Sequence, residues 1–431
     1  MRRTYTEPAR EIPVIGETDV LVAGSGPAGF SAAVCAARNG AKTMLVEALG
    51  NAGGIATSGM MSHFTGSVTS AFYEELLRRM ARRNEGEQRG RRTVTIDPEQ
   101  LKTLCLEMLE EAGVTLLLYT AAVDVIMEGD LLRGVIIENK EGRQAVYARV
   151  IIDATGDGDI AARAGVPYTL GREEDGRMQP ATIMFKVGGV DTERAAFPGS
   201  FETTVETAKG ELQALAKEKL PHPAGHVLLY RTTLPGVVTC NMTNCTDING
   251  LLAADLTRGT RVCREQMEPI VAFLREYVPG YEKCYLLSSA ALLGIRETRH
   301  FHGRYVLTQR DILEKRVFDD WVVRDACFNF DVHNITGAGL DRTGMQKYFP
   351  KDNSYTIPYR SLLPQGVKAL LLAGRNISGS HMAHSNYRAM PICVGMGEAA
   401  GIAAALSCKN GVLPEQLDAG LIQDRLLQSA V

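Results

Sequence analysis

Three glycines and one glutamate near the N-terminus have the types and the spacing of a dinucleotide-binding site. Gly24, Gly26 and Gly29 form a G-x-G-x-x-G sequence, and Glu47 follows 18 residues after the last of them. The first glycine permits a tight turn, the second lets a pyrophosphate approach the backbone, and the third lets a helix pack closely on a sheet. Glu47 can accept hydrogen bonds from ribose hydroxyls. The alternative is a fortuitous glycine-rich turn, and the flanking elements decide between the two.

Those flanking elements have the order that such a site requires. The apolar run at 20–23 predicts a buried strand that ends directly before Gly24, and the small residues at 31–39 predict a helix that stops at Gly40. A second strand is expected at 43–46, so Glu47 follows its carboxyl end. The strand, helix and strand favour dinucleotide binding over a fortuitous turn.

Three later segments fit the same ligand. A second glycine-rich segment, 50–59, contains the pair Gly53-Gly54, which would let the backbone follow the pyrophosphate; a mobile loop is the alternative. The segment 153–159 is a small, glycine-punctuated exit from a predicted strand. Near the C-terminus a strand is predicted at 367–373, and Pro391 opens a helix whose glycines and alanines allow close backbone approach and whose N-terminus offers a positive dipole.

The remaining pattern predicts an α/β fold, a Rossmann-like dinucleotide-binding domain with a parallel sheet and a β-meander, plus an inserted α+β substrate domain; the resemblance described below implies that the first is an FAD-binding domain. The predicted domains are 12–165 and 365–431 for the first, and 166–364 for the second. Asp97 and Pro98 indicate the start of a helix that Gly113 ends. Further helices are expected at 68–83, 202–219 and 250–277, and further strands at 114–118, 122–127, 131–138, 145–152, 227–229, 237–240 and 285–293.

Composition excludes several kinds of partner. The 431 residues are 45% hydrophobic and 23% charged, with a net charge of -3, so neither nucleic acid nor an acidic membrane is expected. We see no signal peptide and no apolar run near the ~20 residues of a membrane span. Acidic residues interrupt the basic cluster 85–92, which favours a solvated loop. Nine cysteines without a C-x-x-C pair fit reduced thiols in a cytoplasmic protein, and redox activity of Cys240 and Cys245 is not expected.

Beyond these patterns, the chain resembles a known family from about Ile12 to Leu406. The three blocks 24–54, 151–157 and 371–406 are similar to FAD-dependent oxidoreductases of the glutathione-reductase-type flavoprotein fold, in the branch related to fumarate reductase flavoproteins. The resemblance to bacterial members is closer. It includes Gly294-Ile-Arg-Glu-Thr-Arg299, Thr356-Ile-Pro-Tyr-Arg-Ser-Leu-Leu363, and the segment 373–385, Ala-Gly-Arg-Asn-Ile-Ser-Gly-Ser-His-Met-Ala-His-Ser.

The resemblance implies FAD as the cofactor and a set of residues that contact it. These predicted contacts are Gly24, Gly26, Pro27, Ala28, Gly29, Glu47, Gly53, Gly54, Thr57, Val123 through its backbone, Thr155, Gly156, Asp157, Gly374, Arg375 and Gly395. Many relatives of the wider fold have an acidic residue where this chain has Arg375, so a ribityl-binding carboxylate is not expected at that position.

The catalytic groups are sought where the flavin ring should lie, within 57–63 and 378–390. His63, His381 and His384 can carry protons, and Arg388 can bind a carboxylate or polarise a carbonyl. Each histidine has a structural hydrogen bond as its alternative role. Arg296, Glu297 and Arg299 form either an anion clamp or an ion-pair network, and His333 is a weaker candidate. His63, Arg296, His381 and Arg388 are the predicted catalytic residues.

No metal site is expected, because no Asp, Glu or Cys lies in the loop that holds His381 and His384. The sequence predicts a flavoenzyme that moves hydride between flavin N5 and a small polar substrate, with proton transfer by His or Arg. The alternatives are a flavin monooxygenase reduced by free NAD(P)H, and a non-catalytic FAD-binding subunit. The electron donor or acceptor is open, as is a homo-oligomer.

Overall fold

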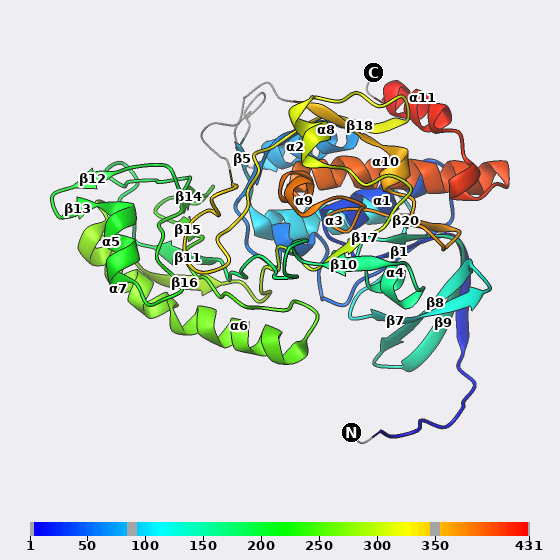
Figure 1. The fold of residues 1–431 in the computed structure, drawn as a ribbon, viewed down its shortest axis with the longest axis horizontal. Helices are drawn as coiled ribbons and strands as arrows, with labels where there is room; N and C mark the ends of the chain where they lie inside the picture. The colour runs from blue at the N-terminus through cyan, green and yellow to red at the C-terminus, as the bar shows by residue number, and fades with distance from the viewer. Residues whose placement is uncertain (1–3, 84–92, 345–353, 430–431) are drawn as a thin grey trace.

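The computed structural model describes residues 4–83, 93–344 and 354–429, and the predicted loop at 85–92 lies outside them. Within this part the chain forms two hydrophobic cores, visible as a larger and a smaller part in Figure 1. The smaller core takes its buried residues from Ala181 to Leu293, and the larger core takes them from both sides of that stretch. Residues 166–364, predicted as one inserted domain, therefore contribute to both cores.

The main sheet belongs to the larger core. Its strands are β1 (Val14–Ala23), β2 (Thr43–Val46), β6 (Thr115–Leu117), β7 (Ala121–Glu128), β8 (Leu131–Asn139), β9 (Gly142–Asp153) and β20 (Leu370–Leu372). The order is β6-β2-β1-β9-β8-β7, and β20 also pairs with β9. β6, β2, β1, β9 and β20 are parallel to their neighbours, whereas β7, β8 and the first half of β9 form the antiparallel meander.

The register of the parallel strands places their carboxyl ends at one edge of the sheet. Ala23 pairs with Val46 on one side and with Asp153 on the other, and Asp153 also pairs with Leu372. Ligands of open α/β sheets bind outside such an edge. Four segments that are far apart in sequence therefore meet there.

Of the helices in this part, α1 (Pro27–Arg38), α3 (Pro98–Glu111), α4 (Asp159–Arg163) and α10 (Met390–Asn410) pack on the main sheet. The others are α2 (Ala71–Arg83), α8 (Gln309–Leu313), α9 (His381–Tyr387) and α11 (Ala419–Ser429). α1 and α10 pack closely: a Cβ on Gly397 would lie 2.0 Å from the carbonyl oxygen of Ala28, and the Ser31 hydroxyl donates to the carbonyl of Val394 at 2.7 Å. The small residues predicted after Pro391 serve this helix contact.

α10 bears on the expectation that no apolar run approaches the length of a membrane span. It is long and apolar enough to cross a membrane by length and composition, yet 94% of its apolar window is buried inside the protein. Figure 1 shows it running through the larger part beside α1. A helix that is buried on all sides is apolar all round, so the apolar composition of α10 is explained by its burial in the core.

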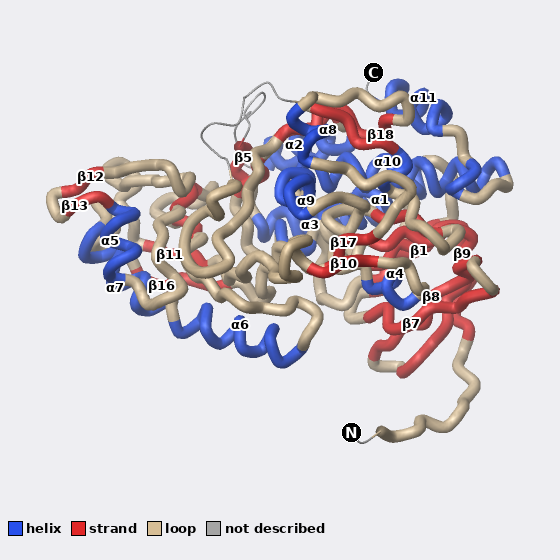
Figure 2. The backbone as a smooth tube through the Cα atoms, viewed as in Figure 1, coloured by secondary structure: helices blue, strands red, loops and turns tan. Residues whose placement is uncertain are grey.

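The smaller core is built on an antiparallel sheet with the order β14-β15-β11-β16. Its elements are β11 (Phe185–Gly188), the hairpin β12 (Glu206–Thr207) and β13 (Gly210–Glu211), α5 (Leu212–Lys219), β14 (Leu229–Arg231), β15 (Val238–Cys240), α6 (Ala253–Glu265), α7 (Met267–Tyr277) and β16 (Tyr285–Ser289). Figure 2 shows that loops make up much of this part between its strands and helices.

Short sheets connect distant segments around both cores. They are β10 (Tyr168–Leu170) with β17 (Arg299–Phe301), β3 (His63–Thr65) with β5 (Thr93–Thr95), and β19 (Tyr355–Pro358), β18 (Trp321–Cys327) and β4 (Ser67–Thr69) in that order. The short helices η1 (Gly54–Ala56), η2 (Tyr359–Ser361) and η3 (Pro414–Gln416) complete the described elements.

Three helix predictions are wrong in their extent. The helix expected from Val68 begins at Ala71, because Val68 belongs to β4 and pairs with β18. In the stretch 202–219 only α5 is helical, since Gly210 has φ +125° and forms the hairpin before it. The stretch 250–277 is two helices that meet at Gln266, whose side chain exchanges hydrogen bonds with the backbone of Asn244. In the first and third cases a tertiary contact replaces the local helical preference, and in the second a local hairpin does.

Candidate functional site

The glycine turn after β1 has the shape that a dinucleotide requires. Gly24 has φ +90°, and a Cβ on it would lie 2.5 Å from the carbonyl oxygen of Ala154. A Cβ on Gly29 would lie 1.8 Å from the carbonyl oxygen of Gly24, which fixes the close approach of α1 to the turn. By contrast, a Cβ on Gly26 would meet nothing within 4 Å and so would project into open space. That space before the N-terminus of α1 fits a pyrophosphate.

Glu47 lies beside this turn. One of its carboxylate oxygens accepts hydrogen bonds from the backbone N–H and the hydroxyl of Ser25, at 2.8 and 2.6 Å, and the other accepts from the N–H of Leu49 at 2.8 Å. The carboxylate is thus held at the carboxyl end of β2, where a ribose would be bound.

The second glycine-rich segment packs on the first. Gly53 and Gly54 both have positive φ, and a Cβ on Gly54 would lie 2.8 Å from the Cα of Gly26. Thr57 is buried, and its hydroxyl donates to the carbonyl of Ala52 at 2.7 Å. The two glycine-rich segments thus form one continuous surface.

The returning strand closes the other side. Arg375 forms an ion pair with Asp157 at 2.7 Å, and Gly156 packs against the Arg375 guanidinium. Thr155 donates to the buried carboxylate of Asp153, and the Asn376 amide donates to the Asp153 carbonyl at 2.9 Å. The Oδ1 atom of Asn376 is buried without a hydrogen-bond partner among the described residues. An unpaired acceptor at this edge fits a ligand with hydroxyl groups.

Two of the predicted cofactor contacts, Val123 and Gly395, contact other parts of the protein. The backbone carbonyl of Val123, on β7, accepts a hydrogen bond from Arg163 Nε at 2.7 Å. A Cβ on Gly395 would meet the side chains of Val68 and Val323, so the open side of this glycine faces β4 and β18. Gly374, with φ +104°, packs instead against Ala28 in the glycine turn.

A buried group of charged side chains lies where the two cores meet. We define the arginine cluster as Arg296, Asp331, His333 and Arg388. Arg388 contacts the Asp331 carboxylate at 2.8 Å, and His333 Nε2 lies 3.4 Å from the same carboxylate. Although burial opposes ionisation, His333 and the two arginines hold the pKa of Asp331 well below its usual range. Burial lowers the pKa of Arg296 to about 10, and burial with the neighbouring Arg296 lowers that of His333 to about 4.

Neutral imidazoles surround this cluster. Burial lowers the pKa of His63 to about 4 and that of His226 to about 3. The His63 ring lies 4.2 Å from the ring of Tyr230, measured between centroids, and the Nδ1 atoms of both histidines have no hydrogen-bond partner among the described residues. His63 comes from the larger core's β3, whereas Tyr230 comes from β14 in the smaller sheet, so both parts of the protein line this region.

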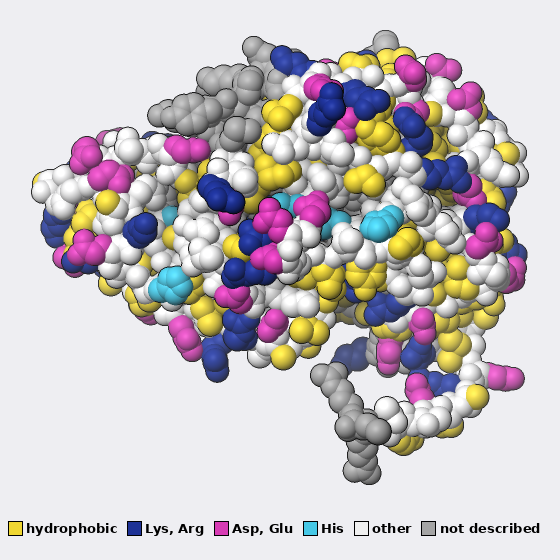
Figure 3. Space-filling model, viewed as in Figure 1, with side chains coloured by type: hydrophobic (Ala, Val, Ile, Leu, Met, Phe, Trp, Pro, Cys, Tyr) yellow, Lys and Arg dark blue, Asp and Glu magenta, His cyan; other side chains and the backbone are white. Residues whose placement is uncertain are grey.

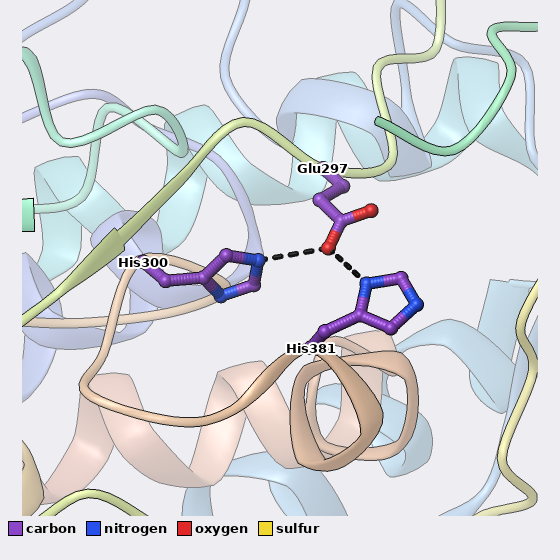
Figure 4. Close-up of side chains that lie close together, drawn as sticks. All are labelled: Glu297, His300 and His381. Carbon is purple, nitrogen blue, oxygen red and sulfur yellow. Dashed lines mark hydrogen bonds and ion pairs between the residues drawn. The ribbon is translucent and has the colours of Figure 1, made fainter. Parts of the chain in front are cut away.

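A second buried group, which we call the glutamate–histidine network, consists of Glu297, His300 and His381. One oxygen of Glu297 lies 2.8 Å from His300 Nε2 and 2.5 Å from His381 Nδ1 (Figure 4). Burial opposes both shifts, yet these hydrogen bonds hold the pKa of Glu297 well below its usual range, and Glu297 raises the pKa of His381. Glu297 therefore favours the protonated form of His381.

The network also corrects an argument about metals. His381 has a carboxylate partner after all, because Glu297 comes from a segment 84 residues earlier, and the three side chains together are of the types that bind metal ions. The separations of 2.5 and 2.8 Å are hydrogen-bond lengths, whereas ligands around tetrahedral zinc lie about 3.3 Å apart. We describe the group as a hydrogen-bonded network.

Gln179 joins the two groups. Its backbone N–H donates to Glu297 at 3.1 Å, and its side-chain carbonyl accepts from the backbone N–H of His333 at 3.1 Å. The glycine-rich surface is adjacent, since a Cβ on Gly294 would lie 3.6 Å from the side chain of Ile55 in its second segment. The predicted cofactor edge and the predicted catalytic region are therefore neighbours.

Of the residues proposed from the sequence, Arg388 contacts Asp331, Arg296 lies close enough for its charge to act on Asp331, and His381 contacts Glu297. His63 lies against Tyr230, and Arg299 is separated from the arginine cluster because it pairs with Asp159 at 2.9 Å. His384 packs its ring edge-on against His300. Sequence reasoning missed Gln179, His226, Tyr230 and His300, because no local motif marks them.

The glycine turn, the carboxylate after β2 and the returning strand at one sheet edge define a Rossmann-like dinucleotide-binding flavoprotein fold. A profile of the FAD dependent oxidoreductase family matches residues 19–426, and the chain belongs to this family. It is an enzyme that uses FAD, which argues against a non-catalytic FAD-binding subunit.

Two thiamine thiazole synthases resemble part of the chain. The protein from Sulfolobus acidocaldarius is 31% identical over 160 residues, which cover 34% of this chain and 59% of that protein. The protein from Methanococcus maripaludis is 27% identical over 165 residues, which cover 36% and 61%. The match thus spans about three-fifths of each relative's own length.

Solved structures share the fold over nearly the whole chain. A geranylgeranyl bacteriochlorophyll reductase-like protein from Thermoplasma acidophilum aligns with a TM-score of 0.50 and 14% identity, covering 95% of this chain and 82% of that one. The p-nitrophenol 4-monooxygenase of Pseudomonas putida aligns with a TM-score of 0.50 and 11% identity, covering 96% and 85%. At such identities the likeness confirms the predicted fold class.

Proposed function

We propose that this enzyme transfers hydride between FAD and a small polar organic substrate that binds at the arginine cluster. FAD supplies the hydride chemistry when it is bound. The observation that carries the proposal is the arginine cluster itself: charged groups are buried together where the two parts of the protein meet, beside the glycine-rich surface, with hydrogen-bonding capacity left over. Perturbed titratable groups in such a place are typical of active sites.

In this proposal the predicted cofactor contacts act as one site. The pairing of β20 with β9, which brings Gly374 and Arg375 beside Asp157, supports joining 12–165 and 365–431 into one FAD-binding unit, with the smaller core over it as the substrate part. The nine cysteines, all free and buried, support the proposed location in the reducing cytoplasm.

The protein residues would bind the substrate and manage its proton. Arg296 and Arg388 would bind and orient a polar group, because both guanidinium groups are buried in the cluster. His381 would store a proton, held on Nδ1 by Glu297, whereas the neutral His63 would accept one at its unpaired Nδ1. Burial of these groups would exclude water from the transfer.

A substrate screen tests this proposal. The FAD-loaded protein would be examined by thermal shift with carboxylates, sugars and hydroxylated rings, and each hit would then be mixed with it without oxygen while flavin absorbance is followed. Bleaching, with a product two hydrogens lighter than the hit, is expected for the wild type and for Arg310→Met, an exposed variant, but not for Arg388→Met.

The same screen can contradict the proposal. If a reduced protein and ¹⁸O₂ convert a hit into a product that contains the labelled oxygen, the protein is a monooxygenase instead. If hits bleach the flavin equally in the wild type and in Arg388→Met, hydride transfer does not occur at the arginine cluster.

A further inference from the structure

The arginine cluster contains more positive than negative charge among the described residues. Arg388 is paired with Asp331 at 2.8 Å. Arg296 is buried, and its printed hydrogen bonds go to neutral oxygens, the carbonyl of Pro180 at 2.5 Å and the hydroxyl of Thr182 at 3.0 Å. In the described part of the chain no carboxylate lies within ion-pair distance of Arg296. Glu297, its neighbour in sequence, is directed to His300 and His381 instead.

The imidazoles around the cluster do not change this balance. His63, His226 and His333 are neutral at pH 7, since burial keeps the pKa of each at about 4 or below. Among the described residues the cluster therefore holds two guanidinium groups and one carboxylate, Asp331, which pairs with Arg388. A buried charge without a counter-charge is costly, and the cost is removed when a ligand supplies the opposite charge.

Unpaired hydrogen-bond donors point to the same kind of ligand. The Nε atom of Arg388 and the Nε2 atom of Gln179 are buried and have no acceptor among the described residues. Gln179 is only 2% exposed, and its amide is held in place because its carbonyl accepts from the His333 N–H. Donors fixed in this way, next to an uncompensated guanidinium, match the oxygens of an anion.

We propose that the substrate carries a carboxylate, which binds at the arginine cluster with Arg296 as its counter-charge and Arg388 and Gln179 as further donors. The inference rests on the proposed function, since it names the chemical class of that substrate. A single carboxylate balances the cluster, whereas a phosphate dianion would leave it with excess negative charge. Asp331 already occupies one side of Arg388, which orients that guanidinium for the ligand.

The test compares carboxylates with their neutral amides. Acetate, succinate and benzoate, and the three corresponding amides, would be titrated into the FAD-loaded protein, and binding would be read from the change in the flavin absorption spectrum. At least one acid is expected to bind about tenfold or more tightly than its amide, because only the acid supplies the counter-charge. Equal affinities for all acids and amides would overturn the proposal.

Variants assign the effect to residues. Arg296→Met and Arg388→Met should each weaken the acid by about tenfold or more and leave the amide within about twofold, whereas Arg388→Lys, which keeps the charge, should weaken the acid less than Arg388→Met does. Arg310→Met is the matched surface control. Should a Met variant fail to fold, Arg388→Lys and the amide comparison still decide.

Two other outcomes separate the possible failures. If the Met variants lower the flavin reduction potential but leave acid binding unchanged, the excess charge serves the flavin, and the carboxylate proposal is wrong. If the acids bind as expected but the flavin neither oxidises nor reduces any of them, the carboxylate site is supported and the proposed hydride transfer is contradicted.

Discussion

Gly29 lies so close to Gly24 that a Cβ atom on Gly29 would fall 1.8 Å from the Gly24 carbonyl oxygen. Gly26, between them, has ordinary backbone angles, φ -61° and ψ -177°, and open space where its Cβ would be. The two glycines are thus required for different reasons. Gly29 serves the packing of α1 on the turn, whereas Gly26 keeps space free for a ligand.

Substitution by alanine should separate these two roles. Gly29→Ala should lower the free energy of unfolding by about 3 kcal/mol, because the new methyl group meets backbone that cannot move away. Gly26→Ala should leave the unfolding of the FAD-free protein unchanged but weaken FAD binding by about tenfold or more. Urea denaturation and a fluorescence titration with FAD measure the two effects. Unchanged FAD affinity in Gly26→Ala would place the pyrophosphate elsewhere.

The glutamate–histidine network should be important for stability. Glu297→Ala removes the shared acceptor of His300 and His381, and leaves two buried donors without it. We expect the free energy of unfolding to fall by about 3 kcal/mol. The exposed pair of Arg310 and Glu314 is the control, and Glu314→Ala should have no measurable effect. A Glu297→Ala protein as stable as the control would show that the network contributes nothing to folding.

Acid should destabilise the protein through its buried neutral histidines. His63, His226 and His333 have folded pKa values of about 4, 3 and 4, below the value of about 6.5 in an unfolded chain. The unfolded state therefore binds more protons between these values, so this stabilisation is complete above about pH 6.5 and is lost as the pH falls toward 4. His381 has the opposite sign, since its raised pKa gives stability that is lost as the pH rises.

Urea midpoints between pH 7 and pH 4 check this expectation. His226→Gln should make the decline less steep, because the amide can keep the hydrogen bond to the Asn241 carbonyl without taking up a proton. The exposed His222→Gln is the control. A decline of equal steepness in all three proteins would exclude His226 as a contributor.

The contact between α1 and α10 should tolerate no side chain at Gly397. A methyl group there would lie 2.0 Å from the backbone carbonyl oxygen of Ala28, so Gly397→Ala should cost about 3 kcal/mol of unfolding free energy. Gly420→Ala, in α11, has no atom closer than 3.4 Å and should be neutral or slightly stabilising. Thermal denaturation compares the two, and equal melting temperatures would show that the helices can move apart.

The elements that the sequence predicted correctly are those whose signals come from residues close together in the chain. The meander strands, their turns at Gly129 and Gly142, and the α3 start at Asp97 are confirmed, because each depends on residues close in the chain. The hairpin at Gly210 was missed, since its charged residues also suit a helix. The expected FAD fold is confirmed because its glycine spacing is local.

The catalytic region was harder to predict for a physical reason. Asp331 and Arg388 are 57 residues apart, and Glu297 and His381 are 84 apart, so their pairings depend on the packing of distant segments. Gln179 joins both groups largely through backbone and amide contacts that carry no sequence signature. A single sequence indicates that such side chains exist, but not which of them meet.

Acidic and basic side chains are interspersed over the face shown in Figure 3, which agrees with the low net charge.

The position of β20 has a consequence for the order of events during synthesis. The first glycine-rich turn leaves the ribosome early, yet Gly374, which follows β20, and Gly397 on α10, which both pack against Ala28, are translated more than 340 residues later. We therefore expect nascent chains that stop before Leu370 to remain colourless. Flavin would be bound only after the late segments have packed against the early ones. Cellular flavin supply would then act on finished polypeptides rather than on growing ones.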